Sequence, residues 1–129
     1  MKNKNIVTAV LALTVLLGVG LGCERTSSLT INGNELEYKN VTTPEAWQLL
    51  NYLIKVKYFD GQKKSAQLNK SGSTYQFRMV VKTEWQNDPS IHEKAKFIAE
   101  DLSINVFNNA PTEVHICDEQ FKTIHVVRP

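Results

Sequence analysis

The sequence predicts an α+β domain in the order ββαββαββ, with two helices on one face of an antiparallel sheet. Two stretches carry apolar residues at helical spacing. Short segments of alternating apolar and polar residues, separated by turn residues, flank both stretches. Each predicted helix has one apolar stripe and each predicted hairpin has one apolar face. Packing both helices against one face of the sheet buries all of these surfaces together.

The first predicted elements are a hairpin and a helix. Residues 29–31 and 36–38 alternate, and Asn32 with Gly33 forms a strong tight-turn signal between them. A helix should follow from about residue 42 to residue 57. Threonine can cap its first turn, and proline and glutamate suit the same turn. Its apolar positions are Ala46, Leu49, Leu50, Leu53 and Ile54.

Residues 44–82 and 90–127 share one plan, a helix followed by a hairpin. Residues 66–68 and 74–82 are predicted strands around a loop, and in the longer strand Tyr75, Phe77, Met79 and Val81 share one face. Residues 83–89 are predicted to be a polar loop. Ser90 and Glu93 fit a capping box for a second helix that ends by residues 108–109. A last hairpin follows, turning at residues 118–120. The sequence places Ile124 and Val126 of its second strand toward the core.

The N-terminus is typical of an exported protein. Residues 1–5 are basic and polar, and residues 6–21 are almost wholly apolar. This run is short for a membrane span but suits the core of a signal peptide. The Leu21-Gly22-Cys23 sequence resembles the lipobox of bacterial lipoproteins, although Gly20 stands where the family usually has leucine. The resemblance implies a signal peptide over residues 1–22 and a lipid on Cys23. Residues 23–28 would then be a tether and residues 29–129 one domain.

The composition restricts the classes of partner and of site. Loss of residues 1–22 removes Lys2 and Lys4, so 13 basic residues of the original 15 remain against 13 acidic residues. This near-neutral domain gives no electrostatic reason to expect nucleic acid as a partner. Cys117 would be the one thiol left, so no internal disulfide is expected. No sequence pattern points to a cofactor.

One group of residues could carry chemistry. If the last hairpin turns at residues 118–120, His115 pairs with Thr123 and lies on the same face as Cys117 and His125. Two imidazoles and a thiolate could bind Zn²⁺ or Cu⁺, although a fourth ligand is not evident. A cysteine beside histidine could also act as a nucleophile if a base activated it. The alternative is a water-facing sheet surface that carries these residues by chance.

Two tryptophans are candidates for contact with a partner. Trp85 lies among polar residues in a predicted loop, and Trp47 lies near the start of the first helix. Exposed aromatic side chains are over-represented at binding hot spots. The alternative is that Trp85 folds back over the edge of the sheet.

Residues 74–82 and 113–118 resemble segments of an uncharacterised domain of bacterial membrane-associated proteins. The resemblance extends over residues 29–127, and it implies no catalytic activity. The sequence therefore favours a non-enzymatic lipoprotein held at a bacterial membrane by Cys23, outside the cytoplasm. It would bind an envelope protein or a second copy of itself. Glu24 after the cysteine favours the outer membrane where one exists. A metal-binding or thiol-active module using His115, Cys117 and His125 is the alternative.

Overall fold

A computed structural model of the chain describes residues 26–129. The predicted signal peptide and Cys23 lie outside the described residues. The elements, in order, are β1 (Ser27–Ile31), β2 (Asn34–Lys39), α2 (Thr43–Lys55), β3 (Ser65–Ser71), β4 (Thr74–Val80), the 3-10 helix η1 (Thr83–Trp85), α3 (Pro89–Asn105), β5 (Thr112–Cys117) and β6 (Thr123–Val127). Strand β1 thus begins within the predicted tether. Within residues 26–129, no helix has the length and apolar character needed to cross a membrane.

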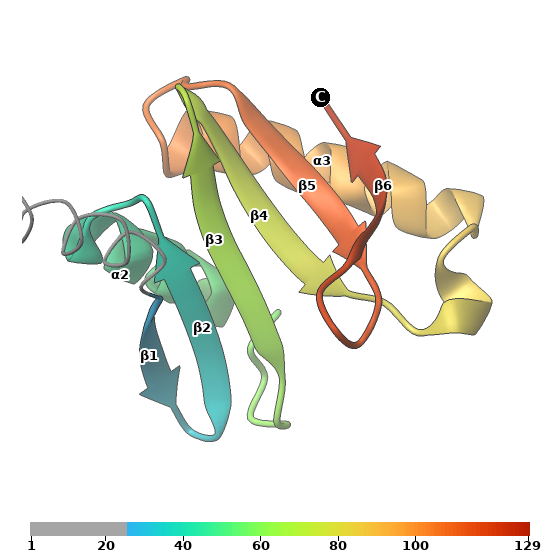
Figure 1. Cartoon of the computed structure of the whole chain (residues 1–129), viewed down its shortest axis with the longest axis horizontal. Coiled ribbons are helices and arrows are strands. Elements are labelled where there is room, and N and C mark those ends of the chain that lie inside the picture. The colour runs from blue at the N-terminus through green and yellow to red at the C-terminus, as the bar shows by residue number, and fades with distance from the viewer. Residues whose placement is uncertain (1–25) are drawn as a thin grey trace, which may run out of the picture.

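The six strands form one mixed sheet in the order β1-β2-β3-β4-β5-β6 (Figure 1). The α+β class is confirmed, but the prediction of a purely antiparallel sheet is wrong. Strands β2 and β3 pair in parallel, and so do β4 and β5. The reason is that each helix joins two neighbouring strands. The helix carries the chain back to the end of the sheet where the first strand began, so the second strand runs in the same direction. Helix η1 also adds an element in the stretch predicted to be a loop.

The two crossovers have opposite hands. Strands β2 and β3 run one way and β4 and β5 run the other, while both crossovers advance in the same direction across the sheet. Both helices nevertheless lie behind the sheet in Figure 1 and contribute to one hydrophobic core. The β2-α2-β3 crossover is therefore left-handed, a rare arrangement, because nearly all such connections are right-handed.

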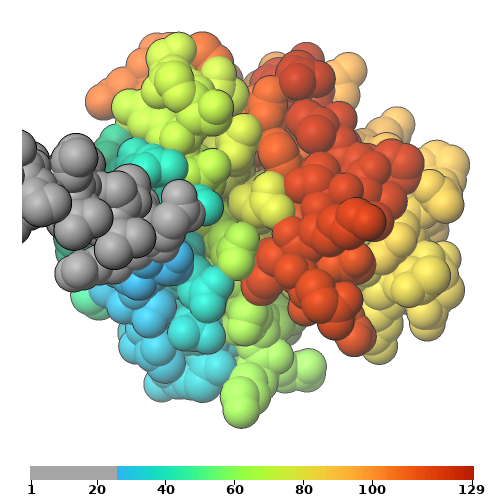
Figure 2. All heavy atoms as spheres, viewed as in Figure 1, coloured from blue at the N-terminus to red at the C-terminus, as the bar shows by residue number. Residues whose placement is uncertain are grey.

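The core lies between the sheet and the two helices. Pairing aligns apolar residues across four strands in two rows, Leu36–Ala66–Met79–Ile116 and Tyr38–Leu68–Phe77–Val114. All eight are buried. Alternation along each strand sends the intervening residues to the opposite face, which neither helix covers. Figure 2 shows this open face, where atoms of β3, β4 and β6 reach the surface.

Local turn and capping residues account for most element boundaries. Asn32 and Gly33 both have positive φ, as the predicted tight turn requires. Thr42 and Glu45 form a capping box at the start of α2. The predicted capping box of Ser90 and Glu93 is wrong. Helix α3 begins at Pro89, and the side chain of Asp88 accepts a hydrogen bond from the Ser90 backbone. Proline suits this first helical position because it has no N–H group to satisfy.

Candidate functional site

A row of polar side chains crosses the open face of the sheet. Glu37, Gln67, Arg78 and His115 occupy paired positions on β2, β3, β4 and β5. Gln67 Nε2 donates to Glu37 Oε1 at 2.7 Å, and Arg78 Nε donates to Gln67 Oε1 at 3.1 Å. Arg78 Nη1 lies 3.0 Å from His115 Nδ1. We call this row the Arg78 ladder, since the guanidinium group joins its two halves.

Arg78 also connects the ladder to the last hairpin. Its Nη1 donates to Thr123 Oγ1 at 2.9 Å, and its Nη2 donates to the carbonyl oxygen of Phe121. A guanidinium group has five donors in a fixed plane, so one side chain can hold several acceptors at once. Arg78 therefore fixes the turn after β5 against the centre of the sheet.

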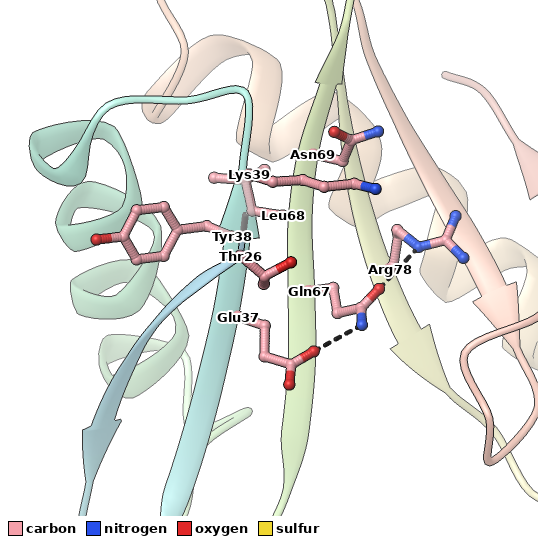
Figure 3. A pocket seen from close by; sticks show the side chains of 8 residues that line it. All are labelled: Thr26, Glu37, Tyr38, Lys39, Gln67, Leu68, Asn69 and Arg78. Carbon is pink, nitrogen blue, oxygen red and sulfur yellow. Dashed lines mark hydrogen bonds between the residues drawn. The ribbon is translucent and has the colours of Figure 1, made fainter. Parts of the chain in front are cut away.

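Figure 3 shows the part of the ladder on β2 to β4. Glu37, Gln67 and Arg78 project from the open face, and dashed lines join Glu37 to Gln67 and Gln67 to Arg78. They line a polar hollow of about 280 Å³ together with Lys39 and Asn69. Because the ladder members bind one another, the hollow offers few unsatisfied groups to a ligand.

His115 is buried and uses both ring nitrogens. Arg78 can only donate, so His115 Nδ1 accepts, and the proton lies on Nε2. Nε2 donates to Glu113 Oε1 at 2.9 Å. Burial opposes ionisation of Glu113, but the hydrogen bond from His115 and the charge of Arg128 outweigh it and lower the pKa of this carboxyl group. Neither nitrogen of His115 is free to bind a metal ion.

Cys117 is fully buried, with an exposed fraction of 0%. Its thiol lies 3.6 Å from the carbonyl oxygen of His115. Burial raises the pKa of Cys117 above its usual value, and the nearby charge of Arg78 offsets this effect only in part. A buried, protonated thiol is inert as a nucleophile and as a metal ligand.

The predicted face shared by His115, Cys117 and His125 does not form. Cys117 pairs with Thr123, but Ile116 pairs with His125 and His115 pairs with Val126 because the register shifts beside Cys117. A shift of one residue moves a side chain to the opposite face of a strand. His125 therefore lies on the helix side, where its ring centroid is 4.8 Å from that of His92.

The same register corrects the predicted orientation of β6. Ile124 and Val126 do not face the core, since each is 39% exposed. Val127 packs against the core in their place. Within residues 26–129, no group of three histidine, cysteine, aspartate or glutamate side chains is arranged to hold a metal ion.

The predicted partner-binding tryptophans are both accessible. Trp47 on α2 is 44% exposed and Trp85 at the end of η1 is 50% exposed. The structure adds Phe97 on α3, which is 63% exposed. The sequence held a signal for Phe97, because this residue falls outside the apolar stripe that Ile91, Ala95, Ile98, Leu102 and Val106 form at helical spacing.

Comparison with known proteins places the domain in a family. The family model AF_1994_N, which describes a family N-terminal domain, matches residues 28–128. The chain belongs to this family. The match agrees with the resemblance to an uncharacterised domain noted over residues 29–127, and it includes every ladder residue and both tryptophans. No curated protein and no solved structure matches the chain. AF_1994_N membership therefore identifies the domain but assigns it no activity.

Proposed function

We propose that this chain is an extracytoplasmic lipoprotein, held at a bacterial membrane by a lipid on Cys23, that works as a non-enzymatic binding or accessory module. The apolar run of residues 6–21 and the Leu21-Gly22-Cys23 sequence support the anchor. A lipoprotein cysteine carries at least two acyl chains, and two chains give stable anchoring where one does not.

The observation that carries the binding role is the position of the exposed aromatic side chains. Trp47, Trp85 and Phe97 are each between 44% and 63% exposed, and all three lie on helical elements. The open face of the sheet instead carries polar groups that bind one another. Aromatic side chains are among the residues that contribute most to the binding free energy when a partner covers them. The partner we propose is an envelope protein that contacts the helical side of the domain.

Crosslinking in intact cells tests this role. The tagged full-length protein is compared with Trp47→Ala, Trp85→Ala and Phe97→Ala variants after capture and mass spectrometry. Val126→Ala is the matched control, because Val126 is also an exposed apolar residue but lies on the open face. We expect one envelope protein to be captured by the wild type and by the control. In at least one aromatic variant this signal should fall about tenfold, which corresponds to a loss of about 1.4 kcal/mol in binding free energy.

Two further results complete the test. Thermal unfolding should show that the aromatic variants remain folded, since exposed substitutions typically change stability by about 0.5 kcal/mol or less. Equal capture of the same proteins by all four variants would contradict the proposal, because the helical side would then play no part in binding. Capture of a second copy of this chain alone would identify self-association as the role of the surface.

A further inference from the structure

A groove opens between the loop after α2, the end of β4 and the first half of α3. Its volume is about 800 Å³. Eight apolar or aromatic residues line it, among them Tyr58, Met79, Val81, Trp85, Ile91 and Ile98. We call it the Trp85 groove. Met79 is buried in its wall, while half of the Trp85 side chain remains in contact with water. Ligand pockets typically measure roughly 300–1,000 Å³ and are mainly apolar, so the groove has the size of a small-ligand site.

The rim of the groove is basic. Four lysines line it, Lys63, Lys64, Lys82 and Lys94, against one carboxylate, Glu119. Lys64 is held in place, because its ammonium group donates to the Tyr58 carbonyl oxygen at 2.9 Å and lies 3.7 Å from Asp60 Oδ2. Among the ion pairs of residues 26–129, none includes the other three lysines. Three positive charges beside an apolar groove are therefore free to meet an anion.

We propose that the Trp85 groove binds a single-chain anionic amphiphile, namely a fatty carboxylate taken up as a monomer. The apolar walls would cover the hydrocarbon chain, and burial of each methylene strengthens binding by up to about fourfold. The lysines at the rim would donate charge-assisted hydrogen bonds to the carboxylate. This inference goes beyond the binding role proposed above, because it requires no protein partner.

Fluorescence titration with dodecanoate tests the inference. The protein is the mature chain, residues 23–129, with Cys23→Ser to keep it soluble. All described strands and core residues lie within this range, and circular dichroism verifies that the protein is folded. Trp47→Phe leaves Trp85 as the one tryptophan. Dodecanoate, kept below its micelle concentration, should produce a saturable blue shift of the Trp85 emission with one molecule bound.

Chain length and charge should both matter. Octanoate has four fewer methylenes and should bind at least tenfold more weakly than dodecanoate. Uncharged dodecanol should also bind at least tenfold more weakly, because a charge-assisted hydrogen bond contributes about 1.5–3 kcal/mol and 1.4 kcal/mol is tenfold. The Lys82→Ala/Lys94→Ala protein should lose a similar factor. Lys55→Ala/Lys96→Ala is the matched control, since these helix lysines lie outside the groove, and it should bind normally.

Three results would overturn the inference. The first is the absence of a saturable shift with dodecanoate. The second is that dodecanol binds as tightly as dodecanoate, or that the Lys82→Ala/Lys94→Ala protein binds dodecanoate as tightly as the protein that keeps both lysines. The basic rim would then have no role. The third is binding to vesicles of phosphatidylglycerol without binding of monomeric dodecanoate, which would make the groove a membrane contact. None of these results depends on whether an envelope protein partner exists.

Discussion

Arg78 is the residue on which most of the open face depends. It donates to side chains of three other strands and to the backbone of the last turn, and it determines the tautomer of His115. His115 and Cys117 looked like a reactive pair in the sequence. In the structure both ring nitrogens of His115 are hydrogen-bonded, and the thiol of Cys117 is buried. The hydrogen bonds of the ladder and of Arg78 therefore join β2, β3, β4, β5 and β6 across the open face.

Removal of Arg78 should destabilise the domain clearly. In Arg78→Met the side chain keeps a similar length, but Gln67 Oε1, Thr123 Oγ1 and the Phe121 carbonyl oxygen lose the donor that Arg78 supplies. We expect a loss of about 1–3 kcal/mol in the free energy of unfolding, the usual effect of leaving buried polar groups unsatisfied. Urea denaturation of the two proteins measures this difference.

Arg128→Met is the matched control for this experiment. Arg128 also binds a carboxylate, but its side chain is 67% exposed. Exposed ion pairs contribute only about 0–1 kcal/mol, so this change should have a small effect. A loss in Arg78→Met no larger than that in Arg128→Met would show that the ladder is not a stabilising network.

At the scale of elements, the sequence predicted local features better than long-range ones. The Asn32-Gly33 turn, the threonine cap at the start of α2 and the alternation along β4 follow from residues close together in the chain, and all three are confirmed. The register of β5 with β6 depends on an irregularity beside Cys117. No turn signal in residues 118–122 revealed that shift, and the candidate metal site disappeared with it.

The start of α3 gives a direct test of the capping arrangement. Asp88 caps the helix and Glu93 does not, contrary to the sequence prediction. Hydrogen bonds from the Ser90 backbone and side chain lower the pKa of Asp88, as expected for a carboxylate at a helix start. Asp88→Ala should therefore lower the melting temperature at pH 7, while Glu93→Ala should leave it nearly unchanged. The reverse ranking would support the capping box of Ser90 and Glu93.

The whole molecule has two unlike sides. One side is the open sheet face, where the hydrogen-bonded Arg78 ladder lies beside the exposed Ile124 and Val126. The other side carries helices with exposed aromatic residues and the Trp85 groove. The sequence predicted two layers, but it could not predict the parallel strand pairs or the left-handed crossover. Both depend on which strands become neighbours, and periodicity carries no information about that choice.

Stability of the whole domain should fall at alkaline pH. Burial raises the pKa of Cys117, and burial with the nearby Cys117 raises the pKa of Tyr58 to about 12. In the unfolded chain these groups ionise at about pH 8.5 and 10. The unfolded state therefore binds fewer protons above pH 8.5, so the free energy of unfolding decreases as the pH rises.

Urea denaturation at pH 8 and at pH 10.5 measures this decrease. Cys117→Ala removes one of the two groups, so its stability should fall less between the two pH values than that of the wild type. An equal fall in the two proteins would show that the Cys117 thiol ionises as easily in the folded state as in the unfolded state.

We propose that this domain works at a membrane to which a lipid on Cys23 holds it. Mass spectrometry of the N-terminal peptide, from protein purified out of native membranes, tests it most directly. We predict a mature chain that begins at Cys23 and carries the added mass of a diacylglycerol, with the Cys23→Ser protein lacking that mass. A chain that retains residues 1–22, or begins elsewhere without lipid, would contradict the claim.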